Sequence, residues 1–191
     1  MNMGTPTENK VQFNLKNVYY AKKTGDSTWA TPKPVPGAVS VALKPEGELK
    51  KFYADGLVYY RSSANNGYSG DIEFARIPDS MRSDIWGMTE DSNNVIVENA
   101  NTESASFALM FEIDGDADEE LYCLYDVSAE RPSIASKTNE ETKEPQTTSL
   151  ALTAIPLTDG KVFARTTAST SAAVKAAWNT TVYTGTAAGN T

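Results

Sequence analysis

Apolar and polar residues alternate with a period of two along most of the chain, which predicts a mainly β protein. In segment 107–112 the odd positions are Phe and Leu, while the even positions are Ala, Met and Glu, so each set faces one side of a strand. The run Leu121–Tyr125 is apolar throughout, which predicts a central strand buried on both faces. Similar alternation marks residues 11–15, 39–43, 57–62, 68–77 and 150–154.

Two short helices are expected beside roughly nine to eleven strands. The first starts at Asp79 or Ser80, either of which could cap it, runs to Trp86 and ends at Gly87. Segment 171–178 is the second, because its apolar residues recur at helical spacing.

Turn signals predict a tight hairpin at the centre of the chain. Residues 45–47 (Pro-Glu-Gly) read as a turn, followed by a long irregular excursion over 44–57. Asn65-Asn66-Gly67 (65–67) is the strongest hairpin signal, because type I′ turns need positive φ at both central positions. We therefore expect strand 57–62 to pair with strand 68–77 through this turn.

Later turns complete the predicted order of strands. Asp159-Gly160 would join strands 150–154 and 162–164 into a last hairpin. The charged segment 139–145 reads as a solvated turn, and 133–136 as extended chain.

The 191 residues fit a single domain, 1–191, long enough to bury a core. We divide it into an N-terminal arm (1–9), a β core (10–179) containing the long loop 44–57, and a C-terminal arm (180–191). Hydrophobic content of 40% and charged content of 22% are ordinary for a globular domain. No apolar run is long enough to span a bilayer, so no membrane partner is expected.

Composition argues against catalysis and against nucleic-acid binding. The net charge is −8 and no basic stripe is visible. Histidine is absent, which removes the usual general base and the commonest metal ligand. The one cysteine, Cys123, lies in the apolar run and should be a buried, inert thiol. We expect no catalytic, cofactor-binding or metal-binding residues.

The acidic segment 114–118 resembles the start of a calcium-binding loop, but two positions depart from that pattern. Glu119 stands where the loop needs glycine, and Tyr125 stands where it needs a bidentate glutamate. A hairpin turn is the better interpretation.

Four segments carry a resemblance to a known family. They are NKVQFNLKNVYYAK (9–22), PVPGAVSVALKPEGE (34–48), KKFYADGLVYYRSSANNGYSGDIEFARIPDSMR (50–82) and ERPSIASKTNEETKEPQTTSLALTAIPLTDGKVFA (130–164). Together they resemble, in one order over about residues 9–180, the major tail (tail-tube) proteins of long flexible-tailed bacteriophages. No single one of them is a chemical fingerprint.

The resemblance implies a β-sandwich or barrel-like core flanked by one or two short helices, with extended terminal arms. It implies hexameric rings whose strands join into one barrel around a lumen, stacked into a tube. DNA would pass through without specific binding, which suits an acidic chain. The implied partners are further copies of the chain, a tape-measure protein, and tail terminator and distal tail proteins. The chain would be made in the host cytoplasm and end in the virion tail.

The family's long loop corresponds to about 44–57, which we expect to contact a neighbouring subunit or ring, with the arms as second choice. Trp29 could either fold back onto the core or anchor a subunit contact. The candidate interface residues are Pro45, Glu46, Gly47, Glu48, Leu49, Lys50, Lys51, Phe52, Tyr53, Ala54, Asp55 and Trp29.

Two alternatives stay open. One is a carbohydrate-binding β-sandwich module that uses exposed aromatic residues. The other is a different tail component of the same fold, such as a terminator or baseplate subunit. The aromatic candidates for a carbohydrate site are Tyr19, Tyr20, Trp29, Tyr59 and Tyr60.

Overall fold

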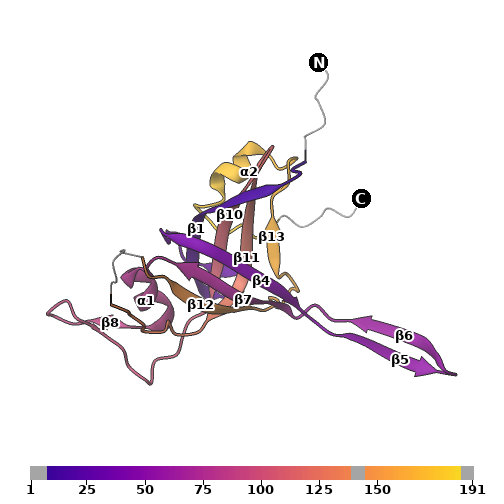
Figure 1. Cartoon of the computed structure of the whole chain (residues 1–191), viewed down its shortest axis with the longest axis horizontal. Helices are drawn as coiled ribbons and strands as arrows, with labels where there is room; N and C mark the ends of the chain where they lie inside the picture. The colour runs from indigo at the N-terminus through magenta and orange to yellow at the C-terminus, as the bar shows by residue number, and fades with distance from the viewer. Residues whose placement is uncertain (1–7, 139–144, 186–191) are drawn as a thin grey trace, which may run out of the picture.

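A computed structural model describes residues 8–138 and 145–185. Most of the predicted arms (1–7 and 186–191), and most of the charged segment 139–145, lie outside the described residues. The mainly β class is confirmed, with one large antiparallel sheet and two short helices (Figure 1). Within the described residues, neither helix has the length and apolar character that crossing a membrane requires.

The elements follow one another along the chain in a long series of strands interrupted once by a helix. In the described part they are β1 (Gln12–Gly25), β2 (Thr28–Trp29), β3 (Lys33–Pro34), β4 (Ala38–Glu46), β5 (Leu49–Ala54), β6 (Leu57–Ser63), β7 (Gly67–Phe74), α1 (Asp79–Trp86), β8 (Thr89–Glu90), β9 (Ile96–Val97), β10 (Phe107–Gly115), β11 (Glu119–Ala129), β12 (Thr148–Ala154), β13 (Phe163–Arg165) and α2 (Ala172–Ala177).

The main sheet has the order β2-β1-β10-β11-β12-β7-β4, with β3 added to β1 and β13 added to β11. Its strands pair antiparallel, and the sheet curls so that β4 approaches β1 in a β-sandwich-like arrangement. The predicted central strand at 121–125 is confirmed as part of β11, which has β10 on one side and β12 and β13 on the other.

Two apolar clusters lie on opposite faces of β10 and β11. Phe107, Leu109 and Phe111 belong to the larger cluster, whereas Ala108 and Met110 belong to the smaller one, as the alternation predicted. Cys123 lies in the smaller cluster and is fully buried. The prediction of a buried thiol is confirmed, and burial raises the pKa of this thiol to about 12.

Helix α1 packs on the larger cluster through Met81, Ile85 and Trp86. It ends at Gly87, whose φ of +64° confirms the predicted stop. The predicted cap was wrong, because Pro78 occupies the N-cap position in extended conformation and no side chain caps the helix.

Helix α2 agrees with the prediction more closely. Ser171 stands at its N-cap and accepts a hydrogen bond from the backbone nitrogen of Val174. Trp178, directly after the helix, is buried in the smaller cluster.

The predicted central hairpin has its tip in the wrong place. Strand β6 pairs with β5 rather than β7, and the chain turns at Asp55-Gly56, where φ is +52° and +76°. Residues 65–67 instead mark the return to the main sheet, where Gly67 pairs with Glu46. The turn at 45–47 was also wrong, because Pro45 and Glu46 belong to β4, an edge strand that tolerates proline.

The predicted last hairpin also needs correction. The turn at Asp159-Gly160 forms, with Gly160 at φ +84° and its nitrogen donating to the carbonyl oxygen of Leu157 at 2.8 Å. Strand β13 pairs with residues 122–124 of β11, however, and not with β12. Strand β11 has eleven residues, so it can accept two short strands along one side.

Candidate self-association surface

Strands β5 and β6 form a two-stranded hairpin, called here the projecting hairpin (residues 49–63), that extends away from the rest of the molecule (Figure 1). It continues the β4–β7 pair, because the nitrogen of Asn66 donates to the oxygen of Glu46 at 2.8 Å. Gly47 permits the close approach at its base, where a Cβ would lie 2.0 Å from the oxygen of Ala64.

The projecting hairpin carries an unusual number of exposed apolar side chains. None of them belongs to either core cluster, and their exposed fractions lie between 58% and 76%. Exposed apolar patches on a soluble protein mark sites of interaction. The residues are Leu49, Phe52, Tyr53, Leu57, Tyr59 and Tyr60.

The register places these side chains on both faces of the projecting hairpin. Phe52 lies opposite Tyr60, and Tyr53 lies opposite Val58. The register shifts between these two pairs, so Tyr59 is the extra residue of a bulge. Because opposite residues share a face and neighbours alternate, both faces carry aromatic rings and neither is covered by the body.

The projecting hairpin is basic on an acidic protein. It contains Lys50, Lys51 and Arg61 but one acidic residue, Asp55, so its net charge is +2. Since the whole chain has a net charge of −8, the rest of the chain, called here the body, carries a net charge of −10. Such a division of charge favours contact between the projecting hairpin of one copy and the body of another.

The structure divides the predicted interface residues into three groups. Pro45 and Glu46 belong to β4 and pair with β7, whereas Gly47 and Glu48 connect β4 to β5. Residues 49–55 form one side and the tip of the projecting hairpin. The other side, residues 57–63, was not among the predicted interface residues, because strand 57–62 was expected to pair with strand 68–77. The signal that could have found it is Asp55-Gly56, a second sequence suited to a type I′ turn.

Trp29 does not join this surface. Its indole nitrogen donates to the carbonyl oxygen of Tyr125 at 3.0 Å, and its ring lies 5.8 Å from the Tyr125 ring. Trp29 packs against the smaller cluster, which agrees with the interpretation that it folds back onto the core.

The aromatic residues considered for a carbohydrate site do not gather on one face. Tyr20 is fully buried, and its hydroxyl donates to Asp84 at 2.8 Å. Burial, together with the nearby Asp84 carboxylate, raises the pKa of Tyr20. Of the five candidates for a carbohydrate site, only Tyr59 and Tyr60 are widely exposed, and they lie on the projecting hairpin.

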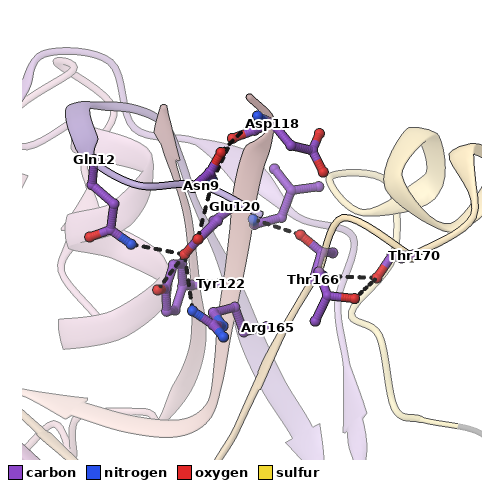
Figure 2. Close-up of polar contacts among 10 residues, drawn as sticks. Asn9, Gln12, Asp118, Glu120, Tyr122, Arg165, Thr166 and Thr170 are labelled. Atoms are coloured by element: carbon purple, nitrogen blue, oxygen red, sulfur yellow. Dashed lines mark hydrogen bonds and ion pairs between the residues drawn. The ribbon is translucent and has the colours of Figure 1, made fainter. Parts of the chain in front are cut away.

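A polar cluster centred on Glu120 ties the N-terminal segment to the body (Figure 2). Its carboxylate accepts hydrogen bonds from Asn9, Gln12 and Tyr122 and pairs with Arg165 at 3.2 Å. Partial burial alone would raise the pKa of Glu120, but these bonds and the Arg165 charge lower it below its ordinary value.

Asn9 is held by a second set of bonds. Its side chain accepts from the backbone nitrogens of Ala117 and Asp118 and donates to the oxygen of Asp118. The predicted arm 1–9 was therefore wrong at this residue. At the other end of the chain, Tyr183 stacks on Trp178 at 5.2 Å, so the predicted arm 180–191 packs on the body as far as this residue.

Lys16 sits among three carboxylates at the end of the β10–β11 hairpin. Its nitrogen lies 2.8 Å from Glu112, 2.6 Å from Asp114 and 2.8 Å from Glu119. Hydrogen bonds to Asp114, Glu112 and Glu119 raise the pKa of Lys16. The three carboxylates are close enough to one another to hold a metal ion, but the ammonium group already supplies the positive charge. Asp114 pairs with Glu119, which confirms the predicted hairpin turn at 114–118.

An apolar hollow, called here the β4–β13 groove, lies where five strands converge. Its volume is about 230 Å³. It is lined by apolar side chains of β4, β7, β10, β11 and β13, among them Val41, Leu43, Tyr68, Ile113, Leu124 and Phe163.

Fold and surface together define a mainly antiparallel, β-sandwich-like protein with a basic, aromatic hairpin standing out from an acidic body. Comparison of the sequence with models of known protein families finds no match, and comparison with curated proteins finds none either.

Proposed function

We propose that this chain is a structural protein that assembles with copies of itself into the tail tube of a long flexible-tailed bacteriophage. The observation that carries the proposal is the projecting hairpin with its six exposed apolar side chains. An isolated two-stranded hairpin is only marginally stable in water, and exposed aromatic rings are costly in solution. Contact with a neighbouring copy would cover the rings and hold the hairpin in place.

The arrangement of the main sheet supports the same proposal. Strand β4 is nine residues long and is the last strand of the sheet order. Its hydrogen-bonded neighbour in the described residues is β7. Long open edges invite pairing with another chain, and closure of a ring of subunits removes them. Contacts between two different surfaces repeat from copy to copy and give rings or filaments.

The resemblance supplies the specific form of the assembly. Stacked hexameric rings would enclose a lumen through which DNA passes without specific binding, and the acidic body suits such a conduit. A tape-measure protein, a terminator and distal tail proteins would be its partners in the virion. In this proposal the chain carries out no chemical reaction and needs no cofactor.

Negative-stain microscopy and sedimentation velocity over a range of concentrations test the proposal. We expect the wild-type chain to form rings and tubes, and the double variant Phe52→Ser/Tyr60→Ser to remain monomeric with an unchanged Tm. Ile134→Ser is the matched control, because Ile134 is fully exposed but lies outside the projecting hairpin. A wild-type chain that stays monomeric at every concentration would falsify the proposal, whereas single rings that never stack would favour a terminator.

A further inference from the structure

We propose that the β4–β13 groove receives an aromatic side chain from the projecting hairpin of a second copy of this chain. This inference rests on the proposed function, since it requires self-association, and it names the surface on the body that the projecting hairpin contacts.

The size of the groove selects its occupant. At about 230 Å³ it is smaller than the roughly 300–1,000 Å³ of ordinary small-molecule sites. Its lining is almost wholly apolar and offers little to orient a polar metabolite. A single aromatic side chain matches both the volume and the lining.

The walls of the groove suit an aromatic ring in particular. Phe163 meets Tyr68 edge to face, with ring centres 5.6 Å apart, and Tyr122 stacks on Phe111 at 5.1 Å. Phe163 remains 42% exposed at the rim. A further ring entering here would gain stacked or edge-on contacts beyond the area that it buries.

The projecting hairpin does not line the groove of its own chain. The groove is lined by Leu43 and Tyr68, close to the ends of β4 and β7 from which the projecting hairpin departs. The projecting hairpin runs away from the body (Figure 1), and three strand residues, about 10 Å, separate Phe52 from Leu49 at its base. A copy's own hairpin therefore leaves the groove open to the aromatic side chains of another copy.

Charge favours this pairing over the alternatives. Two projecting hairpins, each at +2, repel one another, and so do two bodies at −10. The contact between a projecting hairpin and a body is the attractive combination. Because it joins two different surfaces, it leaves one of each free and can repeat.

A substitution that fills the groove with a side chain of the same molecule tests the inference, because it leaves no room for a side chain from a second copy. Val41→Trp should occupy the hollow with the chain's own side chain, keep the monomer folded with an unchanged or higher Tm, and raise the protein concentration needed for assembly at least tenfold. Val97→Trp is the matched control, because Val97 lies on β9, outside the groove lining. If Val41→Trp assembles like wild type, the groove is not the docking site, although the proposed function would stand.

Cross-linking between copies gives an independent measurement. Cys123 is buried, so cysteines introduced at the surface are the accessible thiols. Ser62→Cys, two residues beyond Tyr60, is mixed with Phe163→Cys at the groove rim, and separately with Val97→Cys. Fast disulfide formation in the first mixture and not in the second supports the inference. Equal rates in both mixtures, in protein that still assembles, would overturn it, whereas failure of wild type to assemble would overturn the proposed function as well.

Discussion

Lys51 and Arg61 lie directly opposite each other across β5 and β6, which places two positive charges side by side on the projecting hairpin. Like charges at opposite positions destabilise a strand pair. Such a pair is therefore unfavourable in an isolated chain and becomes favourable when an acidic surface lies against it.

Reversing one of these charges should weaken assembly without lowering the stability of the monomer. Lys51→Glu removes the repulsion with Arg61, so the monomer should be as stable as wild type or more stable by about 0.5 kcal/mol. Assembly should require about tenfold more protein, because the projecting hairpin loses its net positive charge. Urea denaturation measures the stability of the monomer, and sedimentation velocity at low and high salt measures assembly. Lys10→Glu, on an exposed lysine outside the hairpin, makes the same change in charge and should assemble normally.

Two glycines on either side of β6, Gly56 and Gly67, should respond differently to alanine. Gly67 has φ +105°, and a Cβ there would lie 1.9 Å from the oxygen of Ala154. We expect Gly67→Ala to lower the free energy of unfolding by about 3 kcal/mol. Gly56 has φ +76° but open space around it, so Gly56→Ala should cost about 1 kcal/mol. Urea denaturation measures both; equal losses would contradict the close packing described at Gly67.

Removing the ammonium group of Lys16 should leave an unbalanced cluster of carboxylates. Glu112 is only 4% exposed, and Lys16→Met would leave it beside Asp114 and Glu119. We expect a loss of about 2 kcal/mol at neutral pH.

The pH dependence of this loss distinguishes charge from packing. Repulsion among carboxylates requires their charge, whereas packing does not, so part of the stability of Lys16→Met should return in acid solution. In the wild type the raised pKa of Lys16 keeps this contribution present throughout the neutral range. Lys50→Met, whose charge lies 3.8 Å from Glu48 on the exposed hairpin, should change stability little at any pH.

The lowered pKa of Glu120 predicts an acid-sensitive contribution to stability. A carboxyl group whose pKa is lower in the folded state stabilises above its ordinary value of 4.5, and this stabilisation disappears as the pH falls through the lowered value. Glu120→Gln should therefore cost about 1.5 kcal/mol at neutral pH and less below pH 4. Chemical denaturation at several pH values checks this, with Glu103→Gln, at an exposed position, as a control that should change the stability little.

The sequence predicted the parts of the fold that are set by the burial of alternate side chains or by a local backbone requirement. The alternation in 107–112 assigned each side chain of β10 to the correct cluster, because burial on two different faces imposes a period of two. Gly87 was found because a helix end needs a positive φ. These signals depend on residues that are close together in the sequence, so they can be recognised without knowing which strands pair.

The projecting hairpin escaped prediction for the opposite reason. Strand register is specified by a buried face, and β5 and β6 have none. Two sequences, Asp55-Gly56 and Asn66-Gly67, both suit a type I′ turn, and local chemistry does not choose between them. The β4–β13 groove was out of reach as well, because its lining comes from five strands whose neighbours are set by the overall topology.

Because Glu46 and Gly67 face each other on adjacent strands, everything between them is an insertion whose two ends already touch. The body could accept an insertion of another length or composition between Glu46 and Gly67 without a change in the pairing of its main sheet. If the proposed function holds, exchanging these twenty or so residues would change which copies recognise one another and leave the main sheet as it is.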